Sequence, residues 1–392
     1  MTVTIEAGAL SDVGELGVAV HDRGPEIEAN RTLPGDVVAL LVAAGVPKIF
    51  VPTDLGGAQA HVLQGLAAFE DIAYHDGSTG WCAMIAGTTG VLAGFLPVEH
   101  ARAIYGRDDA ITGGFAAPMG RARAFEDSDG GLSVTGRWQW GSGTRHCTAI
   151  GGGCRLVDEH DQPADRALDG LRAPFVFFEP VQVELLDTWY VAGLRGTGST
   201  DYQVTDAVVP EGRWVEVGRT VPTHDGPLYR FSFFGLLAAG ITSVALGLAR
   251  RALDELVEVA ATKRPQGSRR PLAERSTVQA DVASAEGAVA SGWALLAESA
   301  GDAWDTLAAG DTLTDEHRRR LRLAATHGTQ SAARAVDLAY HAAGGTAVYD
   351  TSPLQRVFRD THVATQHAMT APRTLELVGR MRLGLDTDTA QL

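Results

Sequence analysis

Cysteine is scarce in this sequence, with three residues in a chain of 392. Cys82, Cys147 and Cys154 form no CxxC pair and are odd in number, so the sequence indicates neither a disulfide framework nor a zinc site. We therefore expect a reducing environment and a cytoplasmic location. The first 20 residues also lack the basic start and the continuous apolar core of a signal peptide.

Positive charge is also in short supply. The chain has 33 Lys and Arg residues against 48 Asp and Glu residues, which gives a net charge of −15. Such a chain repels nucleic acids and anionic membranes, so we expect a small molecule as the partner instead. The long apolar run 231–250 contains Ser232, Thr242 and Ser243. These hydroxyls and many small residues favour a helix buried among other helices over a membrane span.

The sequence motifs that most readily identify an enzyme are missing. There is no GxGxxG after a predicted strand, no GxxxxGK[ST], no HExxH and no GxSxG. The glycine-rich segment GGFAAPMGRA, residues 113–122, leads into a predicted strand rather than a helix. The phosphate site that a helix N-terminus can form is therefore not indicated there.

The pattern of apolar residues divides the chain into three parts and predicts an α+β multidomain fold. Residues 1–109 and 223–392 show helical periodicity, whereas residues 110–222 show short alternating runs between Gly, Pro and Asp turns. We expect the middle part to form a β barrel or sandwich. The last part predicts a bundle with long helical segments at about 228–262, 271–308, 312–343 and 353–384.

The segment GRWQWGSGTRH, residues 136–146, has a pattern with two readings. On a regular strand, Trp138, Trp140 and Ser142 would share one face, so that an aromatic ring and a hydroxyl point the same way. That arrangement suits a site for a flat ligand. The alternative is a pair of tryptophans packed in the core, with Ser142 at the end of the strand.

Polar residues gather in the last helical segment. Gly344 and Gly345 break the preceding helix, and they are followed by Gln355, Arg356, Arg359, Asp360, His362, Gln366 and His367. On one continuous helix, Arg359, His362 and Gln366 would share a face, and Arg356, Asp360 and His367 an adjacent one. A single histidine is more often structural than catalytic. A whole cluster, however, indicates paired charges or a bound group, because buried charges need partners.

Four segments together resemble one protein family. In chain order they are DGSTGWCAMI, GRWQWGSG, LDTWYVAGLRGTGSTDYQVTDAVVP and LQRVFRDTHVATQHAM. They resemble the acyl-CoA dehydrogenase superfamily over nearly the whole chain, and within it the flavin-dependent monooxygenase branch. The resemblance implies an N-terminal helical domain, a middle β-barrel or sandwich domain and a C-terminal four-helix bundle, with a flavin between the last two.

The resemblance also implies two catalytic residues. Dehydrogenases of the superfamily use a glutamate base at one of two positions, and this chain matches those positions with Phe233 and Ala368, which cannot accept a proton. In the monooxygenase branch, a histidine and a serine correspond to His367 and Ser142. The resemblance places both near the flavin edge where O2 reacts, where a hydrogen-bond donor in a dry pocket favours productive chemistry.

The expected cofactor contacts follow from the same resemblance. Trp140 corresponds to the residue along the flavin ring, and FAAP, residues 115–118, to the loop near its pyrimidine edge. Arg264 follows Lys263 in a connection where relatives place a cation for the flavin phosphate of a neighbouring subunit, although a solvated turn is the alternative. The expected cofactor-binding set is Phe115, Ala117, Trp140, Ser142, Thr197, Ser199, Arg264, Gly344, Gly345 and Arg356.

These expectations describe the oxygenase component of a two-component monooxygenase. It would receive reduced FAD or FMN from a separate flavin reductase, hydroxylate an aromatic or polycyclic small molecule, and assemble as a homotetramer or homodimer. The alternatives are an acyl-CoA dehydrogenase or related FAD-dependent desaturase, and a non-catalytic flavin-fold subunit of a heteromeric assembly. One departure is that some members of the branch carry a histidine where this chain reads AGTTG, residues 86–90.

Overall fold

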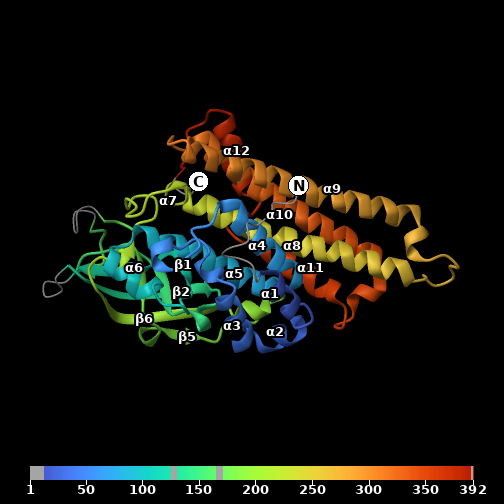
Figure 1. The fold of residues 1–392 in the computed structure, drawn as a ribbon, viewed down its shortest axis with the longest axis horizontal. Coiled ribbons are helices and arrows are strands. Elements are labelled where there is room, and N and C mark those ends of the chain that lie inside the picture. Colours follow the sequence, from blue (N-terminus) through green and yellow to red (C-terminus); the bar gives the residue numbers. More distant parts are fainter. Residues whose placement is uncertain (1–12, 125–129, 165–170, 390–391) are drawn as a thin grey trace.

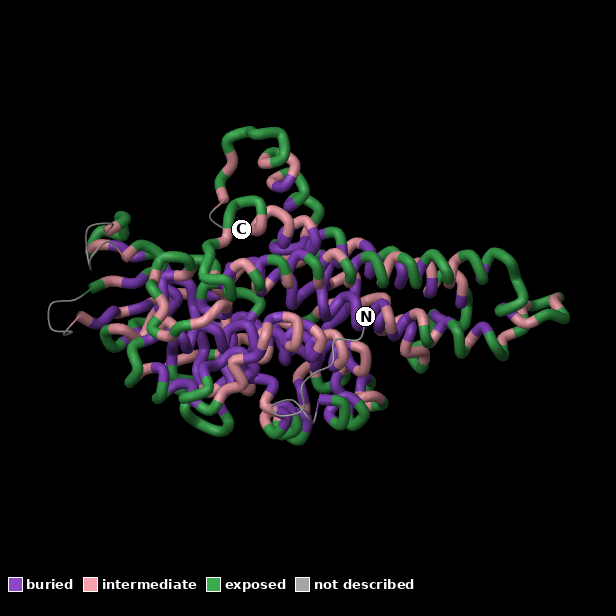
Figure 2. Tube along the Cα trace, turned by 45° about the horizontal axis from the view of Figure 1, so that its top comes forward, coloured by how far each residue is buried: buried purple, intermediate pink, exposed green. Residues whose placement is uncertain are grey.

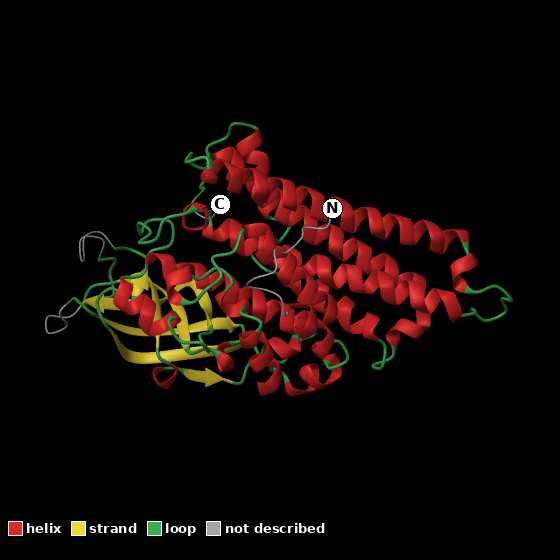
Figure 3. Ribbon diagram, in the orientation of Figure 1, coloured by secondary structure: helices red, strands yellow, loops and turns green. Residues whose placement is uncertain are grey.

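The strands lie together at one end of the molecule, and long helices extend away from them (Figure 1, Figure 3). The structure is a computed structural model that describes residues 13–124, 130–164, 171–389 and 392. The helices before the sheet are α1 Val13–Val20, α2 Gly24–Asn30, α3 Gly35–Ala43, α4 Val62–His75, α5 Gly77–Gly90 and α6 Val98–Tyr105.

Helix α5 connects the two halves of the fold, because it contacts both α8 of the bundle and β1 of the sheet. It begins after Asp76, whose carboxylate accepts hydrogen bonds at 2.7 Å from the backbone N and from Oγ1 of Thr79. This carboxylate satisfies a backbone N–H that the first turn would otherwise leave unpaired. Almost every residue of α5 is buried, which its many Gly, Ala and Thr residues allow.

The middle region takes the form of one mixed sheet. Within the described residues it has seven strands in the order β5-β6-β2-β1-β3-β4-β7. Strands β1 and β3 pair in parallel, and the other neighbours are antiparallel. The strands are β1 Thr112–Ala124, β2 Leu132–Gly141, β3 Ala149–Leu156, β4 Phe175–Phe178, β5 Glu184–Leu186, β6 Thr200–Val209 and β7 Trp214–Val215.

The C-terminal region is the expected bundle of long helices. Its helices are α8 Phe233–Thr262, α9 Ser276–Ala308, α10 Asp315–Ala343 and α11 Pro353–Ala364, with the shorter helices α7 Pro227–Arg230 and α12 Thr374–Arg382. Helix α8 is long and apolar enough to cross a membrane, but 78% of its most apolar stretch is buried inside the protein. The prediction of a helix buried among other helices is therefore confirmed.

One predicted helix is wrong. The segment 353–384 is not continuous, because α11 ends at Ala364 and α12 begins at Thr374. Pro372 lies between them, and a proline cannot donate the backbone hydrogen bond that an uninterrupted helix requires. Gln366 and His367 consequently lie in a turn, so the helical faces expected for these two residues do not form.

The hydrophobic core crosses the boundaries suggested by the sequence pattern. The N-terminal helices and the bundle share one large cluster of buried apolar residues, and most of the sheet packs around a second cluster. In Figure 2 the buried residues concentrate in the interior of the molecule, whereas outer turns of the long helices are exposed. Close packing of α4 on α8 contributes to the shared cluster, because an added Cβ at Gly247 would lie 2.2 Å from the backbone oxygen of Glu70.

We expect Gly247→Ala to destabilise the protein by about 1–3 kcal/mol, because the new methyl group can be placed only if α4 and α8 separate. Thermal unfolding monitored by circular dichroism measures this loss. Gly287→Ala is the control, since Gly287 lies on the exposed face of α9 with nothing within 4 Å of the added carbon. The control should gain up to about 1 kcal/mol from its better helix propensity. Equal effects of the two changes would contradict the packing argument.

Candidate functional site

The structure brings three of the predicted site residues together in one chain of hydrogen bonds. Ser142, directly after β2, contacts Ser199 through their hydroxyl oxygens at 2.7 Å, and Ser199 contacts Oγ1 of Thr197 at 2.6 Å. Thr197 Oγ1 donates to the carbonyl oxygen of Leu194 at 2.8 Å. At the other end, the indole Nε1 of Trp81 on α5 donates to Ser142 Oγ at 3.0 Å.

The glycine-rich link before β6, residues 193–199, is anchored to helix α11. The backbone N–H of Leu194 donates to the buried carboxylate of Asp360, with 2.5 Å between N and Oδ1. Gly193 has no side chain because an added Cβ would lie 2.4 Å from the backbone of Arg359. Burial raises the pKa of Asp360 from its ordinary value of 3.8 to about 7. The link is therefore held by α11 at one end and by the hydroxyl chain at the other.

The prediction that Trp138 and Trp140 share a face is wrong. Trp138 is fully buried in the sheet core, where its ring stacks on Tyr202 at 5.3 Å between centroids. Trp140 is 55% exposed and has a left-handed φ of 58°. The pairing of β2 with β6 shifts register between Trp138 and Gly141, and this irregularity breaks the alternation of side chains.

The exposed ring of Trp140 lies beside the half-buried ring of Phe115. Their ring centroids are 5.5 Å apart at an interplanar angle of 69°. In β1, the pairing with β3 skips from Phe115 to Gly120, so residues 116–119 leave the regular ladder. Ala117 lies exposed within that stretch. Residues 116–119 thus depart from the regular pairing beside two aromatic rings, which offer a surface to a flat ligand.

His367 lies in the turn after α11 and contacts the same tryptophan as Ser142 does. Its ring centroid is 5.9 Å from that of Trp81. The backbone N–H of Met369 donates to Nδ1 of His367 at 3.2 Å. Because a backbone N–H can only donate, Nδ1 of the neutral ring must be the acceptor, and the proton is assigned to Nε2.

The charge state of His367 is set by its surroundings. The pKa of His367 is lowered to about 4, first by loss of hydration and second by the positive charge of Arg322. Arg322, on α10, is 3% exposed and donates from Nη1 to the carbonyl oxygen of Met369 at 3.2 Å. Burial lowers the pKa of Arg322 to about 10, so it stays charged at neutral pH. His367 is thus a neutral side chain with an N–H donor.

The residues expected for the flavin phosphate lie at the far end of the bundle. Lys263 Nζ donates to the carbonyl oxygen of Ala343 where α8 and α10 end, which brings Arg264 close to Gly344 and Gly345. Arg264 is exposed, and Gly344 has a left-handed φ of 59°. These three expected cofactor residues form a group of their own.

This group is remote from Ser142 within one chain. Gly240 of α8 packs on Met84 of α5, one turn beyond Trp81. From Gly240 to Thr262 the helix runs for a further 22 residues, which corresponds to about 33 Å. Arg356 is also separate from the group formed by Arg264, Gly344 and Gly345. Its guanidinium packs over Gly24 of α2, where a Cβ added to the glycine would lie 2.5 Å from the guanidinium.

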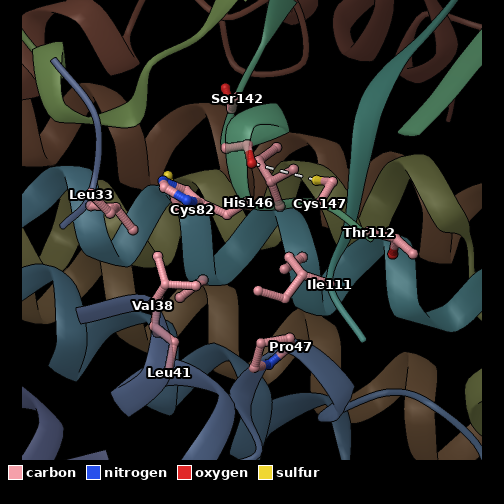
Figure 4. Close-up of a pocket in the computed structure, with 14 residues that line it drawn as sticks. Leu33, Val38, Leu41, Pro47, Cys82, Ile111, Thr112, Ser142, His146 and Cys147 are labelled. Carbon is pink, nitrogen blue, oxygen red and sulfur yellow. Dashed lines mark hydrogen bonds between the residues drawn. The ribbon is translucent and has the colours of Figure 1, made fainter. Parts of the chain in front are cut away.

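A small pocket lies behind Ser142, between α3, α5 and the turn after β2 (Figure 4). Its walls are mainly apolar and include Cys82, His146 and Cys147. Its free space of about 20 Å³ suffices for about one water molecule. Neither His367 nor Trp140 lines it, so this pocket is not the place for a ring system.

Two residues of the site were missed by reasoning from the sequence. Trp81 joins Ser142 to His367, and its segment GSTGW was recognised only as part of a family pattern. Arg322 follows three exposed or half-buried arginines in the run RRRLR, residues 318–322, so nothing in the sequence marked it as buried. A test of helical phase would place Leu321 and Ala325 on the core face, one residue away.

Comparison with known proteins gives consistent matches along the chain. The model of the acyl-CoA dehydrogenase C-terminal domain matches residues 239–372. Indole-3-acetate monooxygenase of Pseudomonas putida is 34% identical over 94% of this chain and 92% of that protein. The flavin-dependent monooxygenase oxygenase subunit HsaA of Rhodococcus jostii is 30% identical over 94% of this chain and 97% of that protein. The crystal structure of 3-HSA hydroxylase from Rhodococcus sp. RHA1 has a TM-score of 0.90 at 25% identity and covers 99% of this chain and 100% of that one.

The buried Asp360 makes stability depend on pH. A carboxyl group whose pKa is higher in the folded state binds more protons there, so its contribution to stability falls as pH rises from about 4 to about 7. Asp360→Asn keeps an oxygen that accepts from Leu194 N–H but has no charge to bury. We expect the variant to lose less stability than the wild type over this range, by up to about 4 kcal/mol.

Urea unfolding at pH 4 and pH 8 measures this difference. Asp350→Asn, a change at an exposed residue before α11, is the control and should follow the wild type. If Asp360→Asn and the wild type lose the same stability between the two pH values, the buried carboxyl group is not the cause.

Proposed function

This chain belongs to the flavin-dependent monooxygenase branch of the acyl-CoA dehydrogenase superfamily, and we propose that it hydroxylates an aromatic or polycyclic small molecule. O2 and reduced FAD or FMN from a separate reductase would be the other reactants. The relatives are named as monooxygenases and as an oxygenase subunit, so the acyl-CoA dehydrogenase alternative is not supported. The proposal extends to a cytoplasmic protein that works with a reductase and a small-molecule substrate.

One arrangement carries the proposal. The hydroxyl of Ser142 and the neutral imidazole of His367 both contact Trp81, and the exposed ring of Trp140 lies two residues from Ser142. A neutral imidazole can offer a hydrogen bond to a reacting oxygen without taking a substrate α-proton as a carboxylate base would, and the Ser142 oxygen can accept a hydrogen bond from a bound group.

The residues present fit a flavin. Trp140 and Phe115 offer aromatic surface to a flat ring, and the irregular stretch 116–119 follows Phe115 directly. Ser142 lies beside this surface with a lone pair left for a ligand. We therefore assign Phe115, Ala117, Trp140, Ser142, Thr197 and Ser199 to the ring-binding part of the site.

A bound reduced flavin supplies the electrons that activate O2. The protein's part is to position donors and to exclude water. His367 presents the Nε2 proton because Met369 occupies Nδ1, and burial, together with the charge of Arg322, lowers the pKa of the imidazole and keeps it neutral. Trp81 fixes Ser142 by donating to its oxygen. The His367 N–H would stabilise negative charge that develops on oxygen beside the ring, and Ser142 would accept a hydrogen bond from the bound group.

We further propose that the site is completed by a second copy of the chain. Arg264, Gly344 and Gly345 lie about 30 Å along the bundle from the ring-binding part, which is farther than one flavin needs them to be. In a homotetramer or homodimer, these residues of one copy would bind the phosphate of a flavin held by another. Arg356 packs over Gly24 within its own chain and is not part of this group.

His367→Ala should uncouple the enzyme. Loss of the Nε2 donor is expected to lower productive hydroxylation on the order of 10²-fold and to increase hydrogen peroxide release. The measurement is hydroxylated product and peroxide formed per reduced flavin, with an aromatic acid such as indole-3-acetate as the first substrate tried. His362→Ala is the control, because His362 lies on α11 and contacts Asp337 instead. Wild-type coupling in His367→Ala would refute the role of the imidazole.

Arg264→Ala should weaken flavin binding about tenfold or more, because a charge-assisted contact to phosphate is lost. Arg269→Ala, in the same exposed connection, is the control. Fluorescence titration with FAD and FMN gives the dissociation constants, and light scattering gives the number of subunits. A monomer that binds flavin with full affinity would contradict completion of the site by a second copy.

A further inference from the structure

The hydrogen-bond chain through Ser142 has a direction. Trp81 Nε1–H can only donate, and the Leu194 carbonyl can only accept. Each hydroxyl between them has a single hydrogen. The Thr197 hydroxyl donates its hydrogen to the Leu194 carbonyl. The Ser199 hydroxyl must therefore donate to Thr197, and the Ser142 hydroxyl must donate to Ser199. In this state Ser142 has no hydrogen left for a ligand, but its oxygen can accept one.

Burial keeps water from disturbing this direction. Ser142, Thr197 and Ser199 are 7%, 2% and 3% exposed. Trp81 is buried too, and its N–H has Ser142 Oγ as its partner. The direction is thus a property of the folded protein rather than of the solvent.

Reversing the direction of the hydrogen bonds among these hydroxyls removes one hydrogen bond. If Ser142 turns its hydrogen outward, Ser199 can donate to Ser142 and Thr197 can donate to Ser199. The contacts among the hydroxyls are then kept, and one bond is lost, from Thr197 Oγ1 to the Leu194 carbonyl. That carbonyl still accepts from Trp189 Nε1 at 3.1 Å, so the reversed state is possible but has one hydrogen bond fewer.

We infer that this chain of hydrogen bonds from Trp81 to Leu194 makes the site prefer reduced flavin over oxidised flavin. The inference rests on the proposed function, which puts the flavin N5 beside Ser142. Reduced flavin carries a hydrogen on N5 and so donates to Ser142, whereas oxidised flavin has only a lone pair there and needs Ser142 to donate. The oxidised form therefore binds only at the expense of the Thr197 bond to Leu194, which corresponds to about tenfold weaker affinity.

Thr197 and Ser199 are positioning residues in this scheme, because they act on the ligand through Ser142. The protein would retain the flavin that a reductase delivers and release it after oxidation. Oxidised flavin would thus bind less tightly because it requires the Ser142 hydroxyl to rotate, and no movement of the backbone is needed.

Thr197→Val is the direct test. The valine preserves the shape of Thr197 but removes its hydroxyl. The state in which Ser142 donates to Ser199 and the state in which Ser199 donates to Ser142 then have the same number of hydrogen bonds. Anaerobic titration of the purified protein with FAD and with dithionite-reduced FAD gives two dissociation constants. Their ratio, oxidised over reduced, is expected to fall about tenfold relative to the wild type. The midpoint potential of bound flavin should fall by about 30 mV, the equivalent of that ratio for two electrons.

Two further variants complete the test. Ser199→Ala removes the acceptor for the Ser142 hydrogen, so it should shift the ratio in the same direction even if Thr197→Val does not fold. Thr144→Val is the control, since Thr144 Oγ1 is equally buried and donates to the carbonyl three residues before it, Gly141 O, at 2.8 Å, outside the chain. Its ratio should match the wild type.

The outcomes separate the two proposals. If the wild type binds neither form of FAD or FMN, the proposed function is wrong and the inference falls with it. If flavin binds but the ratio in both Thr197→Val and Ser199→Ala equals that of the wild type, the inference is wrong while the proposed function stands. A lower ratio in both variants, with no change in Thr144→Val, supports the inference.

Discussion

The hydrogen bond from Trp81 to Ser142 is the contact on which the rest of the site depends. It joins α5, which lies between bundle and sheet, to the turn that follows β2. Both partners are buried, so an unsatisfied indole N–H would cost about 1–3 kcal/mol. The same ring also contacts His367. The relative placement of hydroxyl, indole and imidazole therefore follows from one buried donor and the surfaces that pack around it.

Buried charges position the two segments that have no regular structure of their own. The link before β6 binds Asp360 through the N–H of Leu194, and the turn after α11 binds Arg322 through the carbonyl of Met369. Backbone groups outside helices and ladders need such partners when they are buried. The surroundings also set the pKa of two groups, since burial raises the pKa of Asp360, and burial together with the charge of Arg322 lowers the pKa of His367. Structure and protonation are thus set by the same side chains.

Reasoning from the sequence succeeded where local periodicity controls the fold. The long helices α8, α9 and α10 fall within the predicted segments, and the strands fall within 110–222. It failed where a local rule is interrupted. The shared face of Trp138 and Trp140 assumed an unbroken ladder, and the single helix after residue 353 ignored Pro372. Both interruptions lie at the candidate site, where regular structure gives way to turns.

The sequence by itself determined the order of helical and strand regions, the negative charge, and the motifs that point to the family and to Ser142 and His367. Only the tertiary structure decided that the hydroxyl chain has one direction and that His367 is neutral with its proton on Nε2. The partners that fix these properties are far apart in the sequence: Trp81 and Ser142 are separated by 61 positions, and Arg322 and Met369 by 47. No local pattern can encode a contact over such a distance, because it exists only once both segments are packed.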